Sequence, residues 1–103
     1  LVPDFANAFL TGGVGTGGGR APAAVAADGS FAIVYVNTVR ALTVNLAALA
    51  GIQVEARWYD PTDGSFTPVT GSPFAATGSQ SVTPAGTNSR GKTDWVLVLD
   101  AVP

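Results

Sequence analysis

The residues most suggestive of chemistry stand near the end of the sequence, in the stretch GTNSRGKTDWVLVLD. Its first half matches the phosphate-loop pattern G-x-x-x-x-G-K-[ST] through Gly86, Gly91, Lys92 and Thr93. A phosphate loop must open a helix, because the helix N-terminus and successive N–H groups hold the phosphates. Residues 94–97 follow at once with strand composition, and no helix fits after them. We therefore expect a polar hairpin loop over residues 86–93, with Lys92 in solvent and no nucleotide.

Two further patterns could bind ions or cofactors. Residues 12–19 contain six glycines and include a G-x-G-x-x-G match, which a segment so rich in glycine produces readily. No long helix and no acidic residue at the required distance supports a dinucleotide site, so we expect a mobile loop. Asp60, Thr62 and Asp63 could offer oxygens to calcium. The stronger interpretation is an Asx-capped turn, and calcium stays open.

The composition argues against catalysis. The chain has no His and no Cys, which removes the commonest general base, the commonest metal ligand and the thiol nucleophile. Its seven acidic residues sit mostly at turns. The sequence therefore predicts no enzyme activity and no cofactor. Few Lys, many small residues and no Cys favour an exported bacterial protein. Because the chain also has no Met, we expect a processed product or an excised piece of a longer protein.

Length and charge restrict the partners. The 103 residues predict one domain, over residues 1–103, with a single modest core. Five basic residues scattered along a chain of net charge −2 cannot form a basic face, so we expect no nucleic acid. No apolar run approaches the roughly 20 residues that span a bilayer, so we expect no membrane span.

Short strands with turn punctuation dominate the sequence. The alternation of residues 52–59 is the clearest, with Ile52, Val54, Ala56 and Trp58 on the predicted buried face. Asp60 to Gly64 then predicts a turn, and residues 66–69 its hairpin partner. Further strands are expected at residues 7–11, 21–27, 31–36, 42–46, 80–83 and 95–99, with one helical turn after residue 46. Together they predict an all-β fold, a small antiparallel β-sandwich of about seven or eight short strands.

Two of these strands are apolar on both faces, FAIVYV at residues 31–36 and WVLVL at residues 95–99. Either both faces are covered within the domain, or one face meets another domain or subunit. We favour a partner for part of this surface, with an interface at Val34, Val36, Val96 and Val98. Aromatic side chains near residue 59 suggest a binding surface for sugars or proteins, because exposed rings stack on such ligands. Its expected members are Arg57, Tyr59, Phe66 and Phe74, whereas Trp58 and Trp95 are expected in the core.

Several motifs, in order along nearly the whole chain, resemble one bacterial family, the "putative collagen-binding domain of a collagenase". They are the opening LVPD, AADGSFAIVYV, LTVNLAALAG, VEARWYDPTDGSFTPV and DWVLVLD. The glycine-rich and alanine-rich segments over residues 12–27 depart from the family pattern. The resemblance implies an extracellular β-sandwich accessory module that follows an apiosidase-like (β/α)8 glycoside hydrolase domain. It carries over structural positions rather than binding residues: Trp58, Asp60, Pro61, Gly64, Asp94 and Trp95.

The leading hypothesis is therefore a non-catalytic, C-terminal module of a secreted bacterial glycoside hydrolase or collagenase-like protein. It would pack on the preceding catalytic domain and help to bind polysaccharide or collagen. The alternative is a structural subunit of a self-assembling extracellular fibre, in which neighbouring subunits join by adding strands at an open edge.

Overall fold

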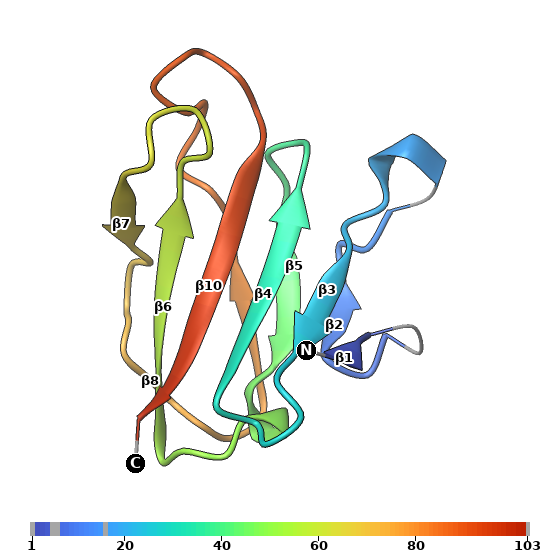
Figure 1. The fold of residues 1–103 in the computed structure, drawn as a ribbon, viewed down its shortest axis with the longest axis vertical. Coiled ribbons are helices and arrows are strands. Elements are labelled where there is room, and N and C mark those ends of the chain that lie inside the picture. Colours follow the sequence, from blue (N-terminus) through green and yellow to red (C-terminus); the bar gives the residue numbers. More distant parts are fainter. Residues whose placement is uncertain (1, 5–6, 16, 103) are drawn as a thin grey trace.

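A computed structural model describes residues 2–4, 7–15 and 17–102, which form two antiparallel sheets packed face to face (Figure 1). In sheet order, sheet A consists of β1 (Val2–Pro3), β3 (Ala23–Val25), β4 (Phe31–Val36), β10 (Trp95–Val102), β6 (Gln53–Tyr59) and β7 (Phe66–Pro68), with β8 (Phe74–Ala75) also pairing with β6. Sheet B consists of β2 (Leu10–Gly12), β5 (Leu42–Asn45) and β9 (Ser79–Val82). Two short 3₁₀ turns, η1 (Gly17–Gly19) and η2 (Leu46–Ala48), complete the elements. The predicted all-β sandwich is confirmed.

Alternation along the strands builds the core between the two sheets. Every second side chain is buried in β4 and in the middle of β10, at Leu97 and Leu99, and the side chains between them face outward. The inward side chains of sheet A are Ala32, Val34, Val36, Val54, Ala56, Trp58, Leu97 and Leu99, and those of sheet B include Leu10, Leu42, Val44 and Val82. The three strands of sheet B cover only the inner face of sheet A, so the outer face of sheet A carries no second layer among the described residues.

Both predicted hairpins on sheet A are present. β3 pairs with β4 across the turn at Asp28, where Gly29 has a φ of 74°. β6 pairs with β7 across the turn that begins at Asp60, and Gly64 there has a φ of 79°. Because side chains disfavour this left-handed region, glycine suits both positions. The helical turn expected after residue 46 is the 3₁₀ turn η2.

Three expectations were wrong or incomplete. Residues 86–93 do not close a hairpin, because β9 belongs to sheet B and β10 to sheet A, so the loop crosses between the sheets. Ile52 was expected on the buried face, but it precedes β6 and is 73% exposed. The short strands β1 and β8 were not predicted, since two residues give no periodic signal.

Two positions of the predicted motifs, Leu1 of LVPD and Thr16 of the glycine-rich segment, lie outside the described residues. Within the part of the chain that is described, no helix has the length and apolarity needed to cross a membrane.

Candidate binding face

The strands of sheet A lie side by side in one layer (Figure 1). Because their register is regular, the residues of the outer face form rows across the sheet. One row across the sheet joins Ile33 of β4, Val98 of β10, Arg57 of β6 and Pro68 of β7. The adjacent row joins Tyr35, Val96, Tyr59 and Phe66 in the same strand order. A third row joins Phe31, Asp100 and Glu55. The β4 side of this face is therefore apolar, and the β6–β7 side mixes aromatic and charged groups.

An apolar hollow lies on the β1–β4 side of this face. Its lining residues are Pro3, Pro22, Ala23, Ala24, Ile33, Tyr35 and Val96. Tyr35 is 40% exposed, and the pairing of Ala24 with Ile33 places both on the same face. A surface of this composition offers packing area without a charged side chain.

The opposite side of the face carries what we call the Phe66 platform, which consists of Arg57, Tyr59 and Phe66. The rings of Tyr59 and Phe66 are tilted by 51° with their centroids 5.0 Å apart. The guanidinium carbon of Arg57 lies 4.8 Å from the centre of the Phe66 ring, within reach of a cation–π contact. Phe66 is nonetheless 52% exposed, so part of this ring is open to a ligand.

Arg57 is also paired in charge. Its Nη2 donates to Oδ2 of Asp100 at 2.6 Å, and both side chains are about two-fifths exposed. An exposed ion pair contributes little to stability, about 0–1 kcal/mol. Its consequence here is positional and electrostatic, because it holds the guanidinium over Phe66 and compensates its charge.

The structure separates the predicted site residues. Arg57, Tyr59 and Phe66 come together as the platform. Phe74 does not join them, because β8 pairs it with Val54, whose side chain faces inward, and Phe74 packs against the core.

The predicted interface residues are also divided. Val96 and Val98 lie on the outer face, whereas Val34 and Val36 are fully buried against sheet B. The interface prediction is corrected for these two valines, and on β4 the outward residues are Ile33 and Tyr35. Both faces of β4 are apolar, so the sequence alone could not indicate which of them sheet B covers.

Asp60 at the end of β6 forms a structural turn. Asp60 as a whole is 3% exposed, and its carboxylate accepts hydrogen bonds from the backbone and hydroxyl of Thr62 and from the backbone of Ser89. Burial acts to raise the pKa of Asp60, but these hydrogen bonds outweigh it and hold the pKa at about 2. Hydrogen bonds from Ser65 likewise lower the pKa of Asp63. Both carboxylates thus have protein donors, and the described residues contain no group of three or more acidic, His or Cys side chains that could hold a metal.

Asn88 organises the loop that matches the phosphate-loop letters. Its Oδ1 accepts from the backbone N–H groups of Arg90 and Lys92, and its Nδ2 donates to Asp94. A phosphate loop needs such N–H groups free to point at the ligand, and here two of them are engaged. No helix follows, since β10 begins at Trp95, and Lys92 is exposed.

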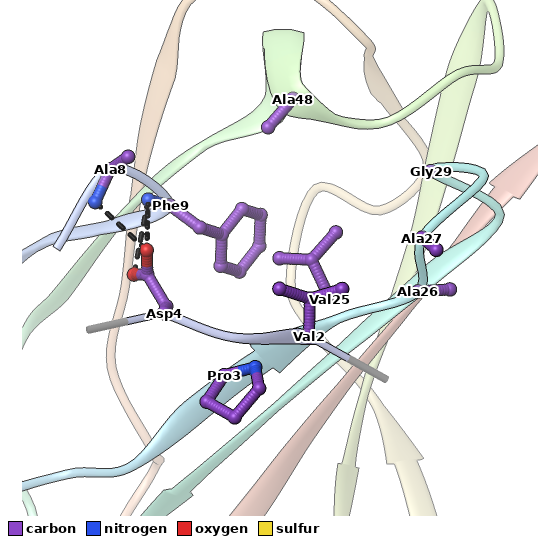
Figure 2. A pocket seen from close by; sticks show the side chains of 10 residues that line it. All are labelled: Val2, Pro3, Asp4, Ala8, Phe9, Val25, Ala26, Ala27, Gly29 and Ala48. Carbon is purple, nitrogen blue, oxygen red and sulfur yellow. Dashed lines mark hydrogen bonds between the residues drawn. The ribbon is translucent and has the colours of Figure 1, made fainter. Parts of the chain in front are cut away.

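A second hollow opens between the sheets near the N-terminus (Figure 2). Asp4, the one charged side chain among its lining residues, accepts from the backbone N–H groups of Ala8, Phe9 and Leu10. The Phe9 ring points toward Val25 and Val2 in Figure 2. Asp4, directly after β1, therefore connects the end of that strand to the start of β2. We interpret this hollow as part of the packing between the two strands and not as a ligand site.

Comparison with known proteins identifies the family of this domain and two structures with the same fold. Residues 2–100 match the family described as "Putative collagen-binding domain of a collagenase". The chain belongs to this family. None of the curated proteins compared with the chain matches it.

Two solved structures share the fold of this domain. One, named "Glycoside hydrolase", superimposes with a TM-score of 0.78 at 26% sequence identity, and the match covers 97% of this chain and 21% of that one. The other is a glycoside hydrolase family 5 protein from Bacteroides vulgatus ATCC 8482, with a TM-score of 0.79 and 24% identity over 97% of this chain and 20% of that one. The chain thus spans about a fifth of the length of each.

The positions shared with the family pattern have structural roles in this domain. Trp58 and Trp95 meet edge to face with ring centroids 6.3 Å apart, and the Trp95 indole donates to the carbonyl of Gly86. Asp60 ties the β6–β7 turn to the loop at Ser89. These shared positions therefore stabilise one end of the sandwich, next to the Phe66 platform.

Proposed function

We propose that this chain is a non-catalytic accessory module of a longer, exported glycoside hydrolase or collagenase-like protein, which packs on the catalytic domain and holds polymer near it. The observation that carries the proposal is the uncovered outer face of sheet A, with an apolar hollow on one side and the Phe66 platform on the other. The matched share of the two glycoside hydrolases supports a place within a larger chain. The low charge and the many small residues support export.

The apolar hollow is the proposed contact with the catalytic domain. Pro3 of β1, the first strand of the module, lines this hollow. A catalytic domain joined ahead of Leu1 would therefore end close to this surface. Ile33, Tyr35 and Val96 offer apolar area there, and Val98 extends that area toward β6. Contacts between domains of one chain use surfaces of this kind.

The Phe66 platform is the proposed contact with polymer. A purified 103-residue chain should be retained on insoluble plant cell-wall glycans or on fibrillar collagen, measured as depletion from the supernatant. Loss of retention on both would leave only the packing role.

A second candidate function is a subunit of an extracellular fibre. It is favoured by β9, an edge strand of sheet B whose residues Ser79–Val82 include no charge and no proline. Charged residues and prolines usually protect an edge strand from pairing with another chain, and β9 has neither. Light scattering and negative-stain microscopy of the isolated chain test this candidate, and a stable monomer at high concentration would exclude it.

A further inference from the structure

The ring of Phe66 is exposed, yet its neighbours fix its orientation. Arg57 lies 4.8 Å from its centre and Tyr59 lies 5.0 Å away at a tilt of 51°. Arg57 is itself held by Asp100 at 2.6 Å. A side chain that is already ordered loses little further freedom when a ligand binds, which favours affinity. Phe66 is therefore a prepared stacking surface rather than a loose hydrophobic side chain.

The charges around this ring determine which ligands fit. The only guanidinium of the platform is paired with Asp100, and the register places Glu55 directly beside Asp100 on the next strand. The local charge is therefore negative, with two carboxylates and one guanidinium. The adjoining turn carries two more carboxylates, Asp60 and Asp63, and the Thr62–Ser89 and Asp60–Ser89 contacts join this turn to the loop at Ser89. Because the guanidinium of the platform is already paired with Asp100, an acidic polymer gains little from it and meets repulsion at Glu55.

A shallow hollow continues the platform along β6. It is lined by Glu55, Ala56, Arg57, Pro68, Ser72 and Pro73. Arg57 pairs with Pro68, and Tyr59 pairs with Phe66, so the hollow and the ring are two residues apart along the strands. That separation is roughly 6.6 Å, comparable to one sugar unit of a polysaccharide.

We propose that the Phe66 platform and this adjoining hollow bind a neutral polysaccharide, an inference that rests on the proposed polymer-holding function. One sugar ring places its apolar C–H face on Phe66, as apolar faces pack on aromatic rings. The hydroxyl groups of the next unit lie within the hollow beside Glu55 and Arg57, whose charged groups can accept and donate hydrogen bonds. Neither contact requires a charge on the sugar.

The test uses the 103-residue chain and three probes: insoluble neutral β-1,4-mannan, polygalacturonate as an acidic polysaccharide, and fibrillar collagen. We expect retention on mannan that is the same at low and at high salt, because no ion pair forms. Phe66→Ala should weaken it about tenfold, the size of one lost aromatic contact. Tyr35→Ala is the matched control, since this exposed ring lies on the same face in the apolar hollow, and it should leave retention unchanged.

A second variant tests the charge argument directly. Asp100→Asn removes the partner of Arg57 and should create salt-sensitive retention on polygalacturonate, which the unaltered chain should lack. Thermal unfolding of each variant verifies that the fold is intact.

Each remaining result has a defined meaning. Retention of the unaltered chain on polygalacturonate alone, or on collagen alone, would overturn the neutral-polysaccharide inference and leave the polymer-holding function standing. Retention on none of the three would overturn both. Equal loss in Phe66→Ala and Tyr35→Ala would overturn the assignment to the platform.

Discussion

Asp60 is the residue that most clearly links sequence motif, structure and solution behaviour. Its buried carboxylate receives donors from its own turn and from the loop at Ser89, which lies 29 positions further along the chain. Asp60, within the family motif VEARWYDPTDGSFTPV, thus joins two connections that belong to different parts of the sandwich. Each of these bonds is donated to the carboxylate, and a charged acceptor makes such bonds stronger than a neutral one does.

The Asp60 carboxylate should make the stability of the domain depend on pH in the acid range. Burial would raise the pKa of Asp60, but its hydrogen bonds bring it down from 3.8 to about 2. A group whose pKa is lower in the folded state stabilises the fold above its unfolded pKa, and this contribution is lost as the pH falls toward the folded pKa. Asp60→Asn should therefore lower the melting temperature at pH 7, by roughly 5 °C for a domain of this size. It should also reduce the decline in melting temperature between about pH 4 and pH 2.

Calorimetry of the two proteins across this pH range measures both effects. Glu55→Gln is the control, since it removes an equal charge from an exposed side chain of the same sheet. If the melting temperatures of Asp60→Asn and of the unaltered chain fall equally between pH 4 and pH 2, the stabilising role of the Asp60 carboxylate is contradicted.

At the scale of the elements, the glycine-rich segment is held by the Arg40 side chain, which comes from the loop between β4 and β5. Arg40 Nε donates to the carbonyl of Gly13, and its Nη2 donates to those of Val14 and Gly19. Asn37 Nδ2 adds a bond to the carbonyl of Gly18. The described part of this segment is therefore anchored, although its composition predicts a mobile loop.

Removing this anchor should loosen the segment locally. Arg40→Met keeps the apolar stem and removes the donors, so amide hydrogen exchange at residues 13–15 and 17–19 should accelerate about tenfold or more. Exchange in β10 should stay unchanged, because the central strand does not depend on this contact. Arg20→Met, at the exposed arginine that directly follows this segment, should accelerate neither region. Acceleration in β10 to the same extent would show that Arg40 supports the whole fold instead.

Sequence reasoning succeeds at this scale where a pattern is local. The β3–β4 and β6–β7 hairpins follow from alternation and turn residues within a few positions, and both are present. The separation of β9 and β10 into different sheets has no local signal, so the loop between them was assigned to a hairpin. The anchoring by Arg40 acts across more than 20 residues. The same limit explains the site: Tyr59 and Phe66 could be paired from their hairpin, whereas the position of Phe74 depends on where β8 joins β6.

At the scale of the whole molecule, the two outer surfaces of the sandwich differ in kind. The strands of sheet B present Thr43, Asn45, Ser79 and Ser81 outward, whereas sheet A presents Ile33, Tyr35, Val96 and Val98. A free-standing domain with one polar and one apolar face has an unused packing surface on the apolar side. The proposed catalytic domain would cover its β1–β4 part and leave the Phe66 platform at the other edge accessible.

This arrangement predicts different effects of the same substitutions in two contexts. Tyr35→Ser combined with Val96→Thr should change the melting temperature of the 103-residue chain by only a few degrees, because both side chains lie outside the core. In the longer protein that we propose, the same pair should weaken the contact between domains, so that one calorimetric transition separates into two. Ser79→Ala combined with Ser81→Ala, two outward positions on sheet B, should leave the transitions coupled. If the sheet B pair separates the transitions and the sheet A pair does not, the catalytic domain packs on the opposite face.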